Sequence, residues 1–192
     1  FKWCINDLWQ AIIQERFFKV LGEVLRFRYE KTIGTVTGII DSRGLEISNK
    51  KGINFEQKHY DSLVIKGPKD ARIENRKIPS LNSNEVLIRV AFVGICGTDS
   101  EIFEGTLGYY KSGMAKYPII PGHESSGEVV LTGANVSNFS EGDRVVVECI
   151  QGCGECSDCL DDEPIRCNER KEVGVIGKNG ACAEYLVTNE RF

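Results

Sequence analysis

The chain has 192 residues, and 24 basic against 28 acidic residues give it a formal net charge of −4. Its 41% hydrophobic and 27% charged residues are typical of an ordinary soluble globular protein. No stretch of about 18 apolar residues occurs, so no membrane-spanning helix is predicted. The mild acidity also argues against a nucleic-acid partner, because such binders usually carry a basic face. Eight cysteines, four of them in one short loop, predict reduced, metal-binding thiols in a cytoplasmic protein rather than a secreted disulfide scaffold.

Residues 1–58 differ in pattern from the rest of the chain. From Ile5 to Tyr29, apolar residues recur at helical spacing and predict one long amphipathic helix. Residues 35–48 predict a β-hairpin around a turn that contains Gly44. Such a helix can bind a partner, but helices of this pattern more often cover a core. We therefore expect residues 1–58 to form an N-terminal extension, and the sequence does not indicate its role.

From Ser62 onward, short β-prone stretches are separated by Gly, Pro, Asn and Asp. They predict strands at 63–66, 71–77, 85–93, 126–131, 144–148 and 183–187. A short helix is predicted to begin after Gly97, since Thr98 and Glu101 have the spacing of a capping box with Thr98 at the cap. No strand–helix–strand alternation that would build a parallel sheet occurs. The predicted fold is mainly β with short helices (α+β), as a compact and mostly antiparallel domain.

A loop with four cysteines is the most specific signal in the chain. Its ligands would be Cys153, Cys156, Cys159 and Cys167. A tetrahedral zinc ion needs four such ligands within about 2.3 Å, and glycines beside the cysteines permit the tight turns. Two disulfides or unconnected thiols are the alternatives, but the spacing favours a closed structural site that performs no chemistry. Acidic residues around the loop indicate a solvated surface, and the flanking Cys149 and Cys182 are expected to pack in the interior.

A second group of candidate ligands lies earlier in the chain. Cys96 precedes the predicted helix, whose N-terminus would favour a thiolate, and a His123-Glu124 pair follows Gly122. From the residues alone, a buried thiol and an ordinary core or surface histidine remain the commoner alternatives.

Five motifs in a fixed order nevertheless resemble a known family. They are Cys96-Gly97-Thr98-Asp99, Gly122-His123-Glu124-x-x-Gly127, Glu141-Gly142-Asp143-Arg144-Val145, the four-cysteine loop, and Gly180-Ala181-Cys182-Ala183-Glu184-Tyr185. Together they resemble the GroES-like catalytic domain of zinc-dependent medium-chain alcohol and polyol dehydrogenases, on the sorbitol and threonine dehydrogenase side of that family. The resemblance covers roughly residues 62–192. It implies a GroES-like β-barrel domain at 59–192, with a structural zinc lobe at about 149–172.

The resemblance also implies roles for single residues. Cys96 and His123 match catalytic zinc ligands, and Glu124 matches an adjacent carboxylate that is a ligand in some members and a near neighbour in others. Asp99 matches a residue that orients the histidine. Thr98 matches the hydroxyl that relays the proton of the substrate alcohol, a role compatible with capping the helix. The four cysteines of the loop match the structural zinc site.

The implied activity is oxidation of a secondary alcohol (a polyol, sugar or amino alcohol) to a ketone. Zinc would lower the pKa of the alcohol, Thr98 would take the proton, and hydride would pass to NAD or NADP. No coenzyme-binding residues can be named. The stretch from Gly174 to Gly180 lacks the Gly-x-Gly-x-x-Gly spacing and is expected to be a loop. The dinucleotide-binding domain would thus lie outside this sequence, and residues 1–192 alone are expected to be inactive.

Several further expectations follow. A histidine that completes the proton relay in some members is absent, with Glu101 in that stretch. Tyr109, Tyr110 and Phe103 could line a substrate pocket, although aromatic residues after a helix more often pack in a core. The expected partner is a small alcohol, with no membrane or nucleic acid, and the resemblance allows a homo-oligomer of the full-length form. The alternative function is a non-catalytic, zinc-stabilised binding module on the same scaffold.

Overall fold

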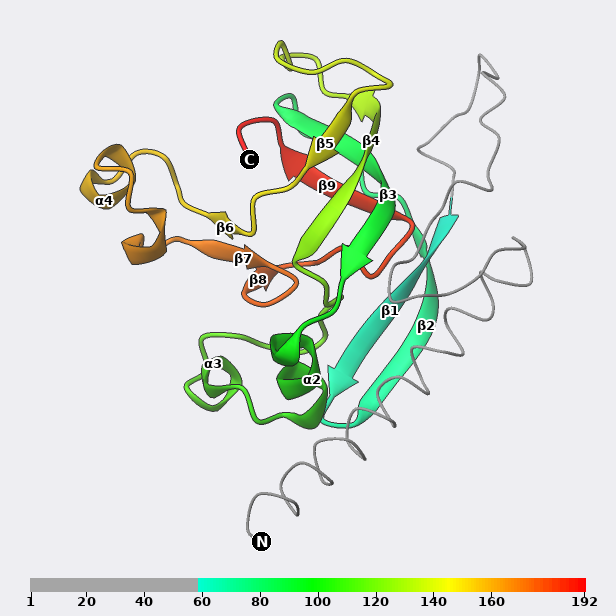
Figure 1. Cartoon of the computed structure of the whole chain (residues 1–192), viewed down its shortest axis with the longest axis vertical. Coiled ribbons are helices and arrows are strands. Elements are labelled where there is room, and N and C mark those ends of the chain that lie inside the picture. Colours follow the sequence, from blue (N-terminus) through cyan, green and yellow to red (C-terminus); the bar gives the residue numbers. More distant parts are fainter. Residues whose placement is uncertain (1–58) are drawn as a thin grey trace, which may run out of the picture.

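A computed structural model of the chain describes residues 59–192, so the predicted helix and hairpin of residues 1–58 lie outside the described residues. Figure 1 shows the described elements in space. In chain order they are β1 (His59–Gly67), β2 (Asp70–Lys77), β3 (Glu85–Gly94), α2 (Gly97–Glu104), α3 (Gly108–Lys111), β4 (Glu124–Thr132), β5 (Arg144–Val146), β6 (Ile150–Gln151), α4 (Ser157–Leu160), the 3-10 helix η2 (Pro164–Arg166), β7 (Lys171–Val173), β8 (Gly177–Lys178) and β9 (Tyr185–Asn189). None of the described helices is long and apolar enough to cross a membrane.

An antiparallel sheet of four strands, in the order β5-β4-β3-β9, forms the centre of this part of the chain. In the long strands, β-branched and leucine side chains such as Leu87 and Val129 are fully buried, which is the pattern expected of strands that face a core. The β3–β4 pairing contains two register shifts, and such irregularities bend a sheet. The sheet therefore curves around the apolar core.

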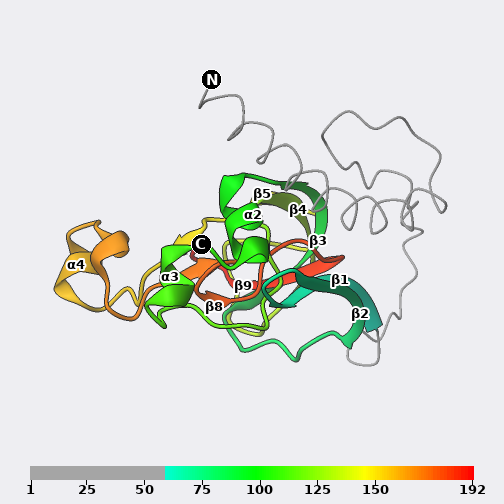
Figure 2. The same ribbon diagram turned by 90° about the horizontal axis from the view of Figure 1, so that it is seen from below.

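The hairpin of β1 and β2 packs on the same core. Leu63 and Ile65 of β1 are fully buried, and single bridges join Ser62 to Ala183 and Ile65 to Ile119. These bridges connect the hairpin to the segments that precede β4 and β9. Figures 1 and 2 show the hairpin beside the central sheet from two directions. The prediction of a mainly β fold with short helices is thus confirmed.

Two predicted strands are displaced in the structure. The strand expected at 144–148 ends at Val146, and the one expected at 183–187 runs from Tyr185 to Asn189. The physical reason for the second difference is that residues 183 and 184 bond to β1: Ala183 forms a bridge with Ser62, and the Glu184 N–H donates to the Asp61 carbonyl at 3.1 Å. The strand therefore begins only at Tyr185.

A small sheet of β6, β7 and β8 carries the four-cysteine loop. It contains a parallel pair, β7–β8, in contrast to the antiparallel pairing of the central sheet. Strands of two or three residues give no periodic signal in a sequence, which is why they are not predicted. In both views the segment with α4 and η2 projects away from the rest of the described fold.

One buried polar cluster joins the small sheet to the central sheet. Lys178 Nζ of β8 donates to Gln151 Oε1 of β6 at 2.8 Å and to Thr188 Oγ1 of β9 at 3.1 Å. Gln151 and Thr188 are both buried. Burial lowers the pKa of Lys178 to about 8 from an ordinary value of 10.5, because desolvation disfavours the charged form.

The lowered pKa of Lys178 makes a prediction about stability. Between pH 8 and 10.5 the unfolded chain holds the Lys178 proton more tightly than the folded chain, so this group's contribution to the free energy of unfolding rises with pH across that window. Urea unfolding of Lys178→Met should lack this rise in the free energy of unfolding relative to the wild type, whereas a variant of exposed Lys77, Lys77→Met, should retain it. Parallel pH profiles for wild type and Lys178→Met would contradict the assignment.

Candidate metal centres

Strand pairing brings the first group of predicted ligands together. The antiparallel pairing of β3 with β4 places Gly94, at the end of β3, opposite Glu124, at the start of β4. Cys96 lies two residues beyond Gly94, and His123 directly precedes Glu124. Two segments 27 residues apart in the sequence thus meet at one end of the central sheet.

The start of helix α2 positions the Cys96 thiol. Cys96 itself is the N-cap: its Sγ accepts a hydrogen bond from Thr98 N–H at 3.3 Å, and the Asp99 carboxylate accepts one from Cys96 N–H at 3.0 Å. The prediction of Thr98 as the cap, with Glu101 reaching back, is therefore wrong. The capping box is shifted by two residues because the thiol and the shorter Asp99 side chain supply the acceptors, and this arrangement leaves half-buried Thr98 within the first turn.

Asp99 links the two ligand-bearing segments. Its side chain is fully buried, and its Oδ1 accepts the Gly122 N–H at 2.9 Å while its Oδ2 accepts the Cys96 N–H. The same Oδ1 lies 3.7 Å from His123 Nδ1. One carboxylate therefore fixes the backbone on both sides of the site and faces the histidine ring.

The side chains converge as a metal site requires. Cys96 Sγ lies 3.1 Å from His123 Nε2, and the ligand atoms of Cys96, His123 and Glu124 all lie within 4.8 Å of one another. His123 Nδ1 is buried without a hydrogen-bond partner, and Asp99 is the acidic group that faces it. With the proton on Nδ1, Nε2 presents its lone pair toward Cys96. A thiolate, an imidazole and a carboxylate are donors that suit zinc.

An open hollow of about 510 Å³ lies beside these ligands. Its lining combines polar side chains with apolar ones: Phe92, Gly94, His123, Glu124, Ser125, Ser126, Val146 and Val147. Glu124 itself is exposed. A Cβ atom at Gly94 would lie 2.5 Å from Glu124 Oε2, so the absence of a side chain at Gly94 gives the carboxylate its place. The site is therefore accessible to a small molecule.

The backbone of Gly174 and Gly180 packs closely against Gly122, in the turn that carries His123. A Cβ atom at Gly174 would lie 2.9 Å from the Gly122 nitrogen, and one at Gly180 would lie 2.3 Å from the Gly122 oxygen. Both positions require glycine. The stretch from Gly174 to Gly180 was expected to be a loop, and apart from the short β8 it is one. Nothing in the sequence indicates that it packs on the ligand turn.

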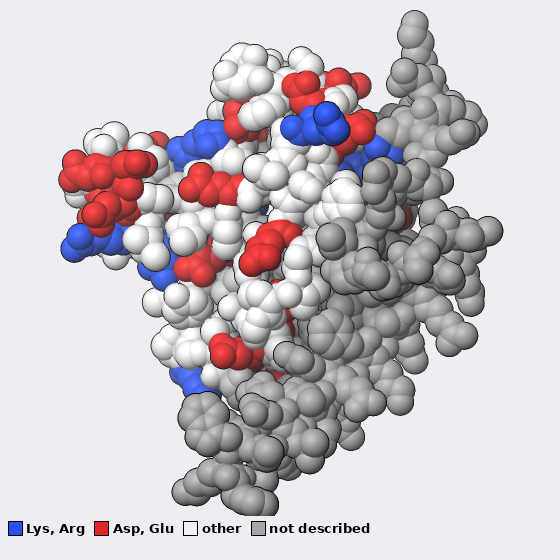
Figure 3. Space-filling model, in the orientation of Figure 1, with Lys and Arg blue, Asp and Glu red and all other residues white. Residues whose placement is uncertain are grey.

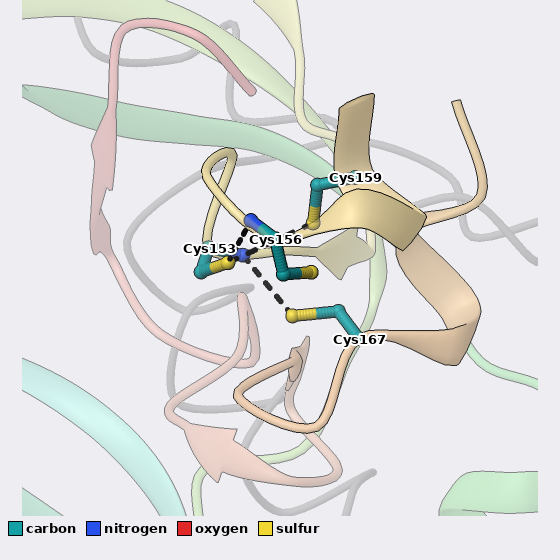
Figure 4. A group of neighbouring side chains, drawn as sticks. All are labelled: Cys153, Cys156, Cys159 and Cys167. Atoms are coloured by element: carbon teal, nitrogen blue, oxygen red, sulfur yellow. Dashed lines mark hydrogen bonds between the residues drawn. The ribbon is translucent and has the colours of Figure 1, made fainter. Parts of the chain in front are cut away.

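The four cysteines of the loop form a second, separate group. Figure 4 shows their side chains pointing toward a common centre. All four sulfur atoms lie within 4.8 Å of one another, and Cys153 Sγ lies 3.9 Å from Cys159 Sγ. A tetrahedron of thiolates around zinc has S···S edges of about 3.8 Å, so the arrangement fits this ion. None of the four thiols is in a disulfide.

Backbone N–H groups around Cys153 favour the thiolate form of this one cysteine of the loop. The N–H groups of Glu155 and Cys156 donate to Cys153 Sγ, each at 3.4 Å, and they lower the pKa of that thiol to about 6. Arg191, just after β9, holds the loop from the other side by donating to the carbonyls of Gly152 and Cys153 at 2.9 Å. Acidic side chains gather on the projecting α4 segment (Figure 3), as expected of a solvated surface.

The remaining predicted residues are placed as follows. Cys182 and Phe103 are buried in the core, in accord with packing roles, and neither Tyr109 nor Tyr110 lines the hollow. Cys149 is only half-buried, and desolvation raises the pKa of its thiol to about 11. Phe92, Ser125 and Val146, which line the hollow, are the residues that sequence reasoning missed.

Comparisons with known proteins agree with this architecture. Residues 82–192 match the family model "Alcohol dehydrogenase GroES-like domain". The chain is 39% identical over 124 residues to D-arabinitol dehydrogenase 1 of Uromyces fabae, and 34% identical over 132 residues to sorbitol dehydrogenase of Bacillus subtilis. These matches cover 65% and 68% of this chain but 34% and 36% of the relatives. The chain thus spans about a third of their length.

A solved structure shows the same fold. The described part superimposes with a TM-score of 0.63 and 26% identity on a protein of Sinorhizobium meliloti 1021 that was solved with bound NADP. The match covers 70% of this chain and 37% of that one. With the family model matching more than half of its length, the chain belongs to the medium-chain alcohol and polyol dehydrogenase family and contains its GroES-like domain.

Proposed function

We propose that this chain is the catalytic part of a zinc-dependent, NAD(P)-linked oxidoreductase that oxidises a secondary alcohol to a ketone. The observation that carries the proposal is the convergence of Cys96, His123 and Glu124 beside an open hollow, apart from the four-cysteine group. The relatives named above act on polyols by name. The polar serines and the carboxylate in the hollow suit a substrate with several hydroxyl groups.

In this proposal Cys96 and His123 hold the reactive metal, with Glu124 as a third ligand or close neighbour. Asp99 Oδ1 faces His123 Nδ1 at 3.7 Å, and its negative charge favours the tautomer with the proton on Nδ1, which leaves the Nε2 lone pair free for the metal. Bound zinc would supply Lewis acidity that lowers the pKa of a substrate hydroxyl. Thr98 lies half-buried two residues from Cys96, and its hydroxyl, which does not cap the helix, is the group assigned to take the proton.

The four-cysteine group holds the second, structural zinc in this proposal. Four thiolates leave no position for a substrate, so this ion shapes the lobe at about 149–172 and takes no part in catalysis. We further propose that residues 59–192 form the catalytic domain, that residues 1–58 are an extension, and that NAD or NADP is bound by the remainder of the full-length protein. Residues 1–192 alone should then show no dehydrogenase activity.

Metal stoichiometry tests the proposal against a non-catalytic module that keeps only the structural ion. The wild-type chain, dialysed against zinc-free buffer, should retain two zinc ions, and Cys96→Ser should retain one with an unchanged far-UV CD spectrum. Cys149→Ser is the matched control, since its thiol lies outside both ligand groups, and it should retain two.

A single zinc ion in the wild type, lost neither by Cys96→Ser nor by His123→Ala, would overturn the reactive site and favour the binding module. In the full-length protein, a Cys96→Ser variant with the same turnover number as the wild type would likewise overturn the reactive site.

A further inference from the structure

The guanidinium of Arg170 lies where the four-cysteine lobe meets the rest of the fold. Its Nη1 donates to the Ile165 carbonyl, within η2, at 2.7 Å, and its Nε donates to Glu172 Oε1 of β7 at 3.0 Å. Its side chain is only 20% exposed and that of Glu172 only 11%. The Arg170 guanidinium thus connects the four-cysteine lobe to β7, the strand that follows the lobe in the chain. An arginine can do this because its planar guanidinium carries several N–H donors that point in different directions.

The same guanidinium also contacts the segment after helix α2. It lies 6.0 Å from the ring centre of Tyr109 and 4.0 Å from Met114 Sδ. The next residue along the chain, Tyr110, packs on Tyr117 at 4.2 Å between ring centres, and the Tyr117 hydroxyl donates to the Ile102 carbonyl of α2 at 2.5 Å. Helix α2 is the element capped by Cys96.

A second route runs through β7. Glu172 is followed by Val173, whose N–H donates to the Cys149 carbonyl at 2.9 Å, and then by Gly174, which packs against the backbone of Gly122. Gly122 directly precedes His123. Arg170 therefore contacts two series of packed segments. One passes through Tyr109 and its neighbours to helix α2, which Cys96 caps, and the other passes through β7 and Gly174 to the turn before His123.

We propose that Arg170 is a positioning residue that couples the two metal sites, so that metal in the four-cysteine lobe strengthens metal binding by Cys96 and His123. When the lobe is ordered, the Ile165 carbonyl accepts a hydrogen bond that holds the Arg170 guanidinium in place. The guanidinium in turn holds β7 through Glu172 and the α3 segment through Tyr109. Coupling between two binding sites is reciprocal, and values of 5- to 150-fold are typical. The inference rests on the proposed function, because it needs metal at the reactive site.

The test is a competition titration of the 192-residue chain with zinc against a chromophoric chelator. Cobalt(II) absorption distinguishes the two sites, since the lobe offers four thiolates and the reactive site one. In Arg170→Gln with the lobe loaded, zinc should bind the reactive site about tenfold more weakly, within the range typical of coupled sites, while affinity at the lobe, measured with the reactive site still empty, should change by less than about twofold. Arg170→Lys should restore only part of the loss, because one ammonium cannot reproduce the fork.

Arg166→Gln is the matched control, since Arg166 lies in the same lobe but pairs with Glu163 at the surface, where its side chain is 68% exposed. It should change neither affinity. In a Cys159→Ser background, where the lobe holds no metal, Arg170→Gln should have little further effect on the reactive site.

Three outcomes would overturn the inference. An unchanged reactive-site affinity in Arg170→Gln would show that no coupling passes through this residue. Equal weakening at both sites, with a lower melting temperature, would show that Arg170 only supports the fold. A single metal ion in the wild type would remove the proposed function and this inference together, a result that is distinct from the other two.

Discussion

Cys159→Ser should empty the four-cysteine site and unfold the lobe around it, while the central sheet remains folded. Zinc sites of this kind supply about 10–16 kcal/mol of apparent binding free energy in small zinc-binding peptides, and that energy is folding energy. The lobe has little else to hold it: α4 and η2 have four and three residues, and the side chains of Leu160 and Ile165 are exposed. Loss of one ligand therefore removes its main source of order.

Serine is a suitable probe because it changes the ligand with little change in shape. Cys159 Sγ packs so closely on Gly152 that a Cβ atom there would lie 2.5 Å from it, and a smaller oxygen creates no clash. Zinc content should fall by one ion per chain, and limited proteolysis should cut within residues 153–167 before any other described segment. Leu160→Ser, at an adjacent exposed position, should retain both ions and resist cleavage. A metal-replete, protease-resistant Cys159→Ser chain would refute the structural role.

The cysteine spacing and the order of the short motifs predict two groups of side chains, and the atoms within each group lie within 4.8 Å of one another in the structure. Two residues separate Cys153 from Cys156, and two separate Cys156 from Cys159, so chain geometry alone keeps those thiols close. Cys96 and His123 are different, since only the β3–β4 pairing brings them together. Their meeting was inferred from family resemblance, and the structure supplies the physical reason.

The supporting contacts were not predictable in the same way. The capping box was misplaced because threonine is a preferred N-cap residue and cysteine is an uncommon one, yet Asp99 selects Cys96 by accepting its N–H. The packing of Gly174 on Gly122 and the bonds of Arg170 depend on segments that are far apart in the sequence or lie in strands too short to show periodicity. Local sequence patterns therefore identify the candidate metal-ligand side chains, whereas tertiary packing determines the contacts that position them.

Asp99→Ala should have the largest effect of any single change outside the metal ligands. The substitution leaves the N–H groups of Cys96 and Gly122 without their acceptor in a buried setting, and each unsatisfied group costs about 1–3 kcal/mol. We therefore expect the free energy of unfolding to fall by about 2–5 kcal/mol. It also leaves His123 Nδ1 without the carboxylate that faces it, so zinc affinity at the reactive site should fall by about 10- to 100-fold.

Asp99→Asn keeps the shape of the side chain but removes one of its two hydrogen-bond acceptors and its charge, so it tests what these contribute to stability and to zinc affinity. Its side chain has nearly the same volume, but only one of its two terminal atoms accepts hydrogen bonds, so either the Cys96 N–H or the Gly122 N–H would face an NH₂ group. We expect an intermediate loss of stability with a loss of zinc affinity close to that of Asp99→Ala, measured by chemical unfolding and by chelator competition. Asp143→Asn is the control, because Asp143 also accepts a backbone N–H, from Ser140 at 2.8 Å, but at the exposed surface, where water replaces a lost acceptor. If Asp99→Asn binds reactive-site zinc as tightly as the wild type, the carboxylate merely fills space, and His123 is oriented by the backbone of its turn alone.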